Sequence, residues 1–180
     1  SAYFAKRAES SANALSLRIR FFDYEASFLP PLNVFLDLLG EACRSIFGVS
    51  DGWREHAETE LKISLPDELF ENRMVSNRHA VDVLWAVVPI AEAFVRLSRL
   101  RPLILIFDDI QWADLTSQKI IGHLMRTSVD SPLMIIGLTR RGELEDKQSE
   151  LAVWLQKQAV YRSFTMFELA PLVPENCRVL

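Results

Sequence analysis

Two adjacent carboxylates, Asp108 and Asp109, directly follow the five apolar residues from Leu103 to Phe107. An apolar run without alternation is typical of a strand covered on both faces, as in a parallel sheet. The acids would then lie at the carboxyl end of a buried strand, where open α/β sheets bind ligands. A carboxylate there can hold Mg²⁺ directly or through water, and its neighbour can polarise an attacking water. Helix N-terminal capping, or solvated acids at a strand end, would explain the same residues equally well.

The segments around the acids predict the elements that position them. Thr116 is a candidate N-cap for the helix that follows the acids. The apolar face of that helix comprises Ile120, Ile121, Leu124 and Met125. The run 133–138 predicts a second fully buried strand, and alternation over 15–21 predicts a strand earlier in the chain.

The rest of the chain adds helices between these strands. Apolar residues at helical spacing predict a helix over 32–47 that stops at Gly48, and another over 77–100 that Pro89 would kink. Residues 2–14 favour a helix, and 49–76 favour a short helix or two within irregular structure. A helix over 149–158 and a strand over 161–169 complete the pattern. Buried strands that alternate with helices indicate an α/β domain built on a parallel sheet.

Composition excludes several classes of protein. The chain has 180 residues, of which 49% are hydrophobic and 24% are charged, with a net charge of −4. This balance argues against a disordered chain and a general nucleic-acid binder. No apolar run reaches the roughly 18 residues of a membrane span, so we expect a cytoplasmic protein. The two cysteines, Cys43 and Cys177, have no zinc-ligand spacing. None of the six glycines precedes a lysine, so the chain contains no phosphate-binding glycine loop.

The segment LILIFDDIQWADLTSQKIIGHLM resembles the Walker B region of STAND-type signalling ATPases, relatives of the AAA ATPases that occur with adenylate cyclase, kinase and LuxR-type regulator domains. The family form is an apolar strand, two acids, His or Gln, and then Trp-Ala-Asp, which Gln111 to Asp114 match. PLMIIGLTRRGEL is similar to the family's next strand and sensor segment. FELAPLVPENCRVL resembles the exit from the nucleotide-binding core, and FFDYEASFLPPLNVFLDLL resembles the segment after the P-loop helix.

The resemblance implies a role for each matching residue. Asp108 would organise Mg²⁺, and Asp109 would orient or activate the attacking water. Arg140, preceded by Thr139, would read the γ-phosphate of ATP, for which a guanidinium is well suited. Each has an alternative: Asp109 could cap the following turn, and the pair Arg140-Arg141 could be a solvated surface pair or contain the sensor at either position. The remaining motif residues favour structural roles, packing for Trp112 and capping for Asp114.

The family's glycine-rich loop is the one motif that the chain lacks, and we expect it just before residue 1. The resemblance therefore implies a P-loop NTPase-like α/β fold, with the parallel sheet sandwiched by helices, and one partial ATPase domain over 1–180 in which 49–76 is an insertion. The parent protein would be a Mg²⁺-dependent ATPase that binds ATP and ADP, switches effector domains of the same polypeptide and can form nucleotide-dependent oligomers. This chain alone would bind nucleotide poorly. No membrane partner and no nucleic acid is expected.

Two other interpretations remain open. The module could survive only as an interaction or scaffold domain in which the acids are remnants. A phospho-receiver domain also places paired acids after an apolar strand, but it needs a phosphorylatable Asp at the end of a later strand. The strand over 133–138 is instead followed by Thr139 and Arg140.

Overall fold

The computed structural model describes residues 13–22, 31–70, 84–145, 149–160 and 164–170. These residues divide between two compact units, one ending at Arg140 and the other beginning at Arg141, and each is described by itself. The predicted helix over 2–14 and the segment 171–180 lie outside the described residues, apart from residues 13 and 14.

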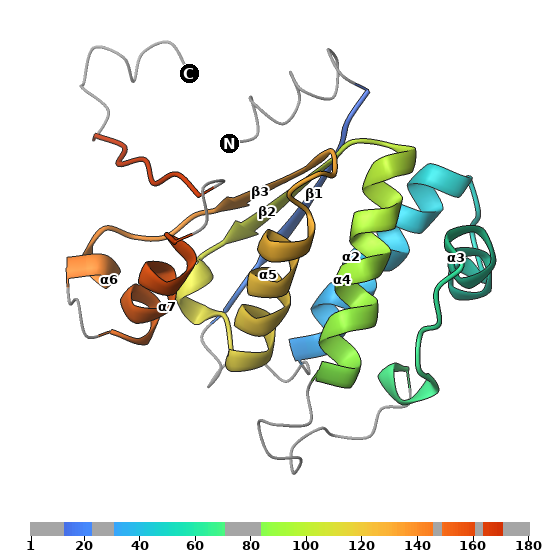
Figure 1. Cartoon of the computed structure of the whole chain (residues 1–180), viewed down its shortest axis with the longest axis horizontal. Helices are drawn as coiled ribbons and strands as arrows, with labels where there is room; N and C mark the ends of the chain where they lie inside the picture. Colours follow the sequence, from blue (N-terminus) through green and yellow to red (C-terminus); the bar gives the residue numbers. More distant parts are fainter. Residues whose placement is uncertain (1–12, 23–30, 71–83, 146–148, 161–163, 171–180) are drawn as a thin grey trace. The chain divides into compact units, whose positions relative to one another are not determined.

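The first unit is built on a three-stranded parallel sheet (Figure 1). Strand β2 (Leu103–Asp108) lies between β1 (Leu15–Arg20) and β3 (Leu133–Gly137). Both neighbours run parallel to β2, with Leu103 opposite Leu15 on one side and opposite Leu133 on the other. All five apolar residues of β2 are buried. The prediction of a parallel α/β sheet around this strand is confirmed.

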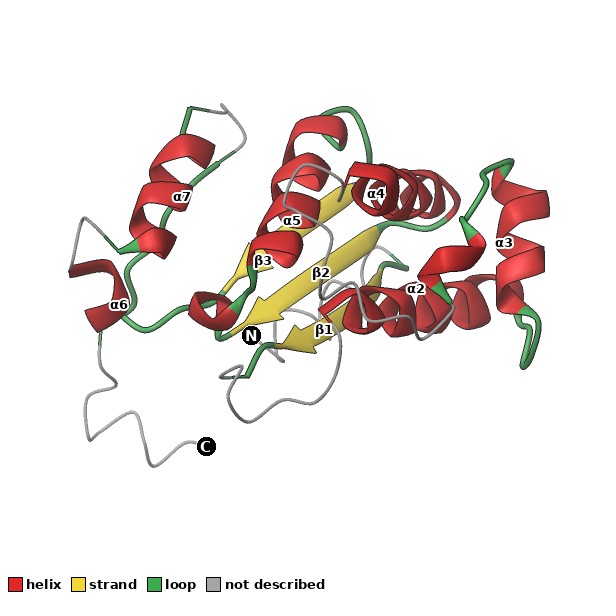
Figure 2. Ribbon diagram, turned by 90° about the horizontal axis from the view of Figure 1, so that it is seen from below, coloured by secondary structure: helices red, strands yellow, loops and turns green. Residues whose placement is uncertain are grey.

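Three helices of this unit cover one face of the sheet (Figure 2): α2 (Pro31–Phe47), α4 (Leu84–Leu100) and α5 (Leu115–Thr127). Phe35 of α2 packs against Phe107 of β2, with ring centroids 5.9 Å apart, and Phe21 completes an aromatic trio. Leu17 and Ile19 of β1 are buried as well. Side chains of a strand alternate between its faces, so the residues between them, Arg18 and Arg20, belong to the opposite face.

Helix α2 ends as the sequence predicts. Gly48 follows it with φ of 70°, a left-handed conformation that costs glycine little, and its amide donates to the Arg44 carbonyl at 2.9 Å. Helix α4 continues across Pro89 to Leu100. No described helix is long and apolar enough to cross a membrane.

Residues 53–70 form a small helical segment, as predicted for this region. It contains α3 (Trp53–Leu61) and the short 3-10 helix η2 (Asp67–Leu69). Arg54 ties the two together: its guanidinium donates to the Leu65 carbonyl at 2.5 Å and to Asp67 Oδ1 at 2.6 Å. The Arg54 guanidinium also lies 4.2 Å from the centre of the Phe70 ring.

Three predictions of local structure are wrong. Asp114, and not Thr116, caps α5, because both carboxylate oxygens of Asp114 accept hydrogen bonds from backbone amides of the first turn. Strand β3 is only partly buried and Met134 is 58% exposed, since β3 pairs with a single described strand. Residues 164–170 form no strand, and their apolar side chains Met166, Phe167 and Leu169 are exposed.

The second unit contains the short helix α6 (Gly142–Glu145) and α7 (Glu150–Gln158), which confirms the helix predicted over 149–158. Ser149 caps α7 by accepting a hydrogen bond from the Ala152 amide at 3.2 Å. Arg141 and Glu168 of this unit form an ion pair of 2.8 Å.

Candidate functional site

The two acids lie where β2 ends and the chain turns. Asp108 is the last residue of the strand, and Asp109 adopts a left-handed conformation with φ of 54°. Asp is one of the few residue types that visits this conformation readily. The backbone around the acids is fixed on both sides, because the Phe21 amide donates to the Asp108 carbonyl and the Ile110 amide donates to the Leu138 carbonyl, each at 3.0 Å. The carboxylates are therefore held on a rigid strand end.

Two arginines of β1 reach these carboxylates. Arg18 forms an ion pair with Asp108 through Nη2 and Oδ2. Arg20 Nε lies 3.0 Å from Asp109 Oδ2. The sheet register brings these groups together, because Arg20 is directly opposite Asp108 and Arg18 lies two residues earlier on the same face of β1.

Neither Arg18 nor Arg20 is among the site residues predicted from the sequence. A signal was present, since apolar alternation over 15–21 assigns Arg18 and Arg20 to one face of a strand. The alternation alone does not show which residues the two arginines contact. Asp108 and Asp109 can be identified as their partners only when β1 and β2 are known to be neighbours and their register is known.

A hydrogen-bonded chain connects Asp109 to the end of β3. Gln111 Nε2 donates to Asp109 Oδ1 at 3.2 Å, and the Thr139 hydroxyl donates to Gln111 Oε1 at 3.0 Å. Arg140 Nε lies 3.9 Å from the same Oδ1 atom of Asp109. The structure thus brings Asp108, Asp109, Thr139 and Arg140, the four residues selected from the sequence, to one end of the sheet, together with Gln111.

The surroundings of Asp109 stabilise its charged form. Partial burial by itself raises the pKa of a carboxyl group, but here hydrogen bonds from Arg20 and Gln111, with the charges of Arg20 and Arg140, outweigh it. Together they hold the pKa of Asp109 below its usual value. Asp109 is consequently a weak base and a strong hydrogen-bond acceptor.

Asp114 and Trp112, the other two residues singled out in the motif, lie in different local structures. The Asp114 carboxylate accepts hydrogen bonds from the amides of Thr116 and Ser117, each at 3.0 Å, so it is the N-cap of α5. Trp112 belongs to the 3-10 turn η3 (Ile110–Trp112) and is 39% exposed. The capping role that the sequence favoured for Asp114 agrees with these contacts.

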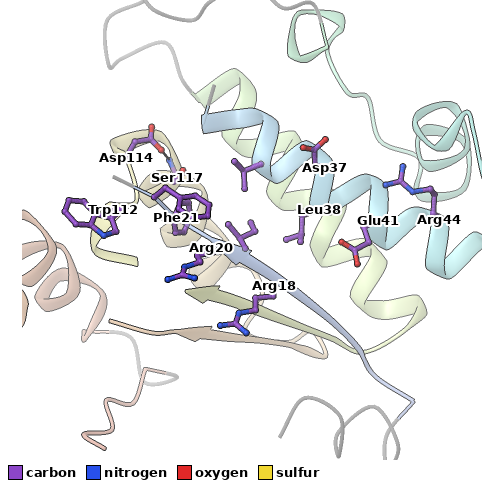
Figure 3. A pocket seen from close by; sticks show the side chains of 13 residues that line it. Arg18, Arg20, Phe21, Asp37, Leu38, Glu41, Arg44, Trp112, Asp114 and Ser117 are labelled. Atoms are coloured by element: carbon purple, nitrogen blue, oxygen red, sulfur yellow. Dashed lines mark hydrogen bonds between the residues drawn. The ribbon is translucent and has the colours of Figure 1, made fainter. Parts of the chain in front are cut away.

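A cavity of about 500 Å³ lies beside β1 (Figure 3). Arg18 and Arg20 line it from the strand, Asp37 and Glu41 line it from α2, and Trp112 lines it from the turn after the acids. Arginine and carboxylate side chains therefore line the same cavity, next to the acid pair.

The donor set at the strand end fits Mg²⁺. The side chains of Asp108 and Asp109 are 17% and 16% exposed, so solvent reaches both carboxylates. Within the described ranges no group of three or more His, Cys, Asp or Glu residues could enclose a metal. One or two carboxylates suffice for Mg²⁺, which keeps several waters and takes further ligands from nucleotide phosphates. Such a site suits a cation that arrives with a phosphate ligand.

Comparison with known protein families finds a match over most of the chain. The model of the AAA ATPase domain family matches residues 2–136, about three quarters of the chain. The matched region includes Asp108 and Asp109 and ends before Thr139 and Arg140. No significant match was found among curated proteins or among solved structures.

Proposed function

The chain belongs to the AAA ATPase domain family, and from that premise we propose that the end of β2 is the Walker B part of an ATP site. The observation that carries this proposal is the convergence of Asp108, Asp109, Thr139 and Arg140 at the carboxyl end of a parallel sheet. Members of this family bind ATP with Mg²⁺. The α/β fold, with its parallel sheet, agrees with a P-loop NTPase-like core.

Asp108 is the proposed Mg²⁺ ligand. Its carboxylate stands on the last residue of a fully buried strand, so its position changes little when a ligand binds. Bound Mg²⁺ would neutralise charge that develops on the phosphates during hydrolysis. Asp108 supplies an oxygen ligand and fixes the depth at which the phosphates lie against the sheet.

Asp109 is proposed to orient the attacking water. Because its pKa lies below the usual value, Asp109 accepts a hydrogen bond well but takes up a proton poorly. Gln111 donates to one oxygen of Asp109 and Arg20 donates to the other, which limits the directions in which a water could be bound. This arrangement favours slow hydrolysis, as expected of a switch.

Thr139 and Arg140 are proposed to report the state of the nucleotide. The Arg140 side chain is 71% exposed, so it is free to turn from Asp109 toward a γ-phosphate. Such a turn would change the Thr139–Gln111–Asp109 chain directly. The chain would thereby carry the sensor of a signalling ATPase in the cytoplasm, in which ATP occupancy switches effector domains or oligomer formation.

Nucleotide binding by the protein extended upstream through the expected glycine loop tests this proposal. We expect Mg-ATP binding by calorimetry, and we expect Asp108→Asn to abolish phosphate release. Asp130→Asn removes an exposed acid from the turn after α5 and is the matched control, with activity unchanged. Absence of nucleotide affinity in the extended protein would contradict the proposal.

A second candidate function is a scaffold domain, and the ion pairs of both acids with Arg18 and Arg20 favour it. In a scaffold these pairs would serve stability alone. An eroded glycine loop upstream of residue 1, together with Asp108→Asn that lowers stability and changes no nucleotide response, would support the scaffold.

A further inference from the structure

Arg18 contacts the carboxylate that the proposed function assigns to Mg²⁺, and the inference drawn here rests on that function. We propose that Arg18 is a displaceable counter-ion of Asp108. It pairs with the carboxylate while no divalent cation is bound, and the cation must displace it to bind.

The strand pairing itself builds this contact. Arg18 lies opposite Ile106, and Asp108 lies two residues further along β2 on the same face. A diagonal neighbour of this kind is within reach of a long side chain. The ion pair thus depends on two rigid strands, so Arg18 remains beside Asp108 whatever the loops do.

The contact is easy to exchange. The Arg18 side chain is 51% exposed, and its partner Asp108 is 17% exposed. Ion pairs of exposed side chains contribute little to stability, because water solvates the separated charges nearly as well. A divalent cation and a guanidinium close to one carboxylate repel each other, so binding of the cation favours departure of Arg18.

The released guanidinium can turn toward solvent, because the Arg18 side chain is 51% exposed. In Figure 3 it points away from α2, the helix whose Asp37 and Glu41 also line the cavity beside β1. Phosphates that arrive with Mg²⁺ would attract the same guanidinium. Arg18 therefore weakens binding of the free cation more than it weakens binding of the cation–nucleotide complex.

Arg20 has a different role in this scheme. It holds Asp109 Oδ2 at 3.0 Å, while Gln111 and Arg140 approach Oδ1. Because the carboxylate is held on both oxygens, Arg20 is a positioning residue that fixes the orientation of Asp109. Only Arg18 stands where the cation is expected.

Binding of Mn²⁺ to the whole chain, measured by electron paramagnetic resonance without nucleotide, tests the proposal. Arg18→Gln is expected to tighten Mn²⁺ binding by about two- to five-fold, the range that corresponds to one weakly competing ion pair. Arg99→Gln removes the same charge from the exposed end of α4 and is expected to change binding by less than about two-fold. Arg18→Lys keeps the charge and should bind Mn²⁺ as the unchanged chain does.

Two results would overturn the counter-ion role. The first is equal Mn²⁺ binding by the unchanged chain and Arg18→Gln, including no detectable binding by either. The second is a gain in Arg18→Lys as large as that in Arg18→Gln, because the charge is then irrelevant. A double variant, Arg18→Gln with Asp108→Asn, distinguishes failure of the proposed function from failure of the counter-ion role. If the double variant keeps the tighter Mn²⁺ binding, Asp108 is not the metal ligand and the proposed function fails.

Discussion

Two arginine–carboxylate networks in the first unit use the same residue types in different ways. At the end of β2, the charged groups of Arg18, Arg20 and Arg140 contact the two acids through side-chain atoms. In the segment 53–70, Arg54 donates to the Leu65 carbonyl, and its partner Glu58 accepts from the Leu65 amide at 2.9 Å. The second network replaces missing backbone hydrogen bonds, whereas the first can exchange partners without exposing the backbone. The network at the strand end is therefore suited to ligand binding, and the Arg54 network is suited to architecture.

The comparison predicts the largest loss of stability from Arg54→Ala. The variant leaves the carbonyl of the buried Leu65 without its donor and removes the packing against Phe70, so we expect a loss of about 2–3 kcal/mol. Urea unfolding measures it, with the exposed Arg99→Ala as control. Mn²⁺ binding should not change. A loss below about 0.5 kcal/mol, typical of a surface substitution, would show that the two networks do not differ in this way.

A smaller loss, about 1 kcal/mol, is expected from Asp114→Ala, because the first turn of α5 loses its cap. Asp114→Ser should recover most of the stability, since a hydroxyl also caps helices. Thermal unfolding compares the two variants. Mn²⁺ binding of Asp114→Ala tests whether the residue also belongs to the strand-end site. We expect no change, and loss of Mn²⁺ binding would show that Asp114 takes part in the site as well as in the helix cap.

A pH-dependent effect is expected at Asp109. The pKa of Asp109 is lower in the folded state than in the unfolded chain. The charged carboxylate therefore stabilises the fold, and this contribution is complete at pH values above the ordinary pKa of Asp. This contribution decreases as the pH falls through the ordinary pKa and then the folded-state pKa. The stability difference between the unchanged chain and Asp109→Asn should therefore shrink between about pH 5 and pH 3. Urea unfolding across this range checks the trend, and a difference that grows at acid pH would contradict it.

Much of the fold could be predicted from local patterns. The unbroken apolar run of β2 and the alternation over 15–21 each specify a strand, and the helical spacing over 32–47 specifies α2. The acids could be placed at a strand end for the same reason. Each of these features depends on residues that are close together in the chain, so a local sequence pattern is enough to predict it.

The errors concern properties that arise between distant segments. Apolar residues in β3 suggested burial, but exposure depends on how many strands lie beside it. Thr116 and Asp114 are both capping residue types, and only the path of the backbone after Trp112 decides between them. Arg18 and Arg20 are 90 and 89 residues away from the acids that they contact, so the order of strands in the sheet had to be known first.

The most direct test of this site is paramagnetic broadening of amide signals by Mn²⁺ with ATP in the protein extended upstream through the expected glycine loop. We predict that broadening concentrates at Asp108, Asp109, Gln111 and Arg140, spares Arg54 and α3, and disappears in Asp108→Asn. Broadening centred on α3, or an unchanged pattern in Asp108→Asn, would contradict the claim that the end of β2 is the Mg²⁺–nucleotide site.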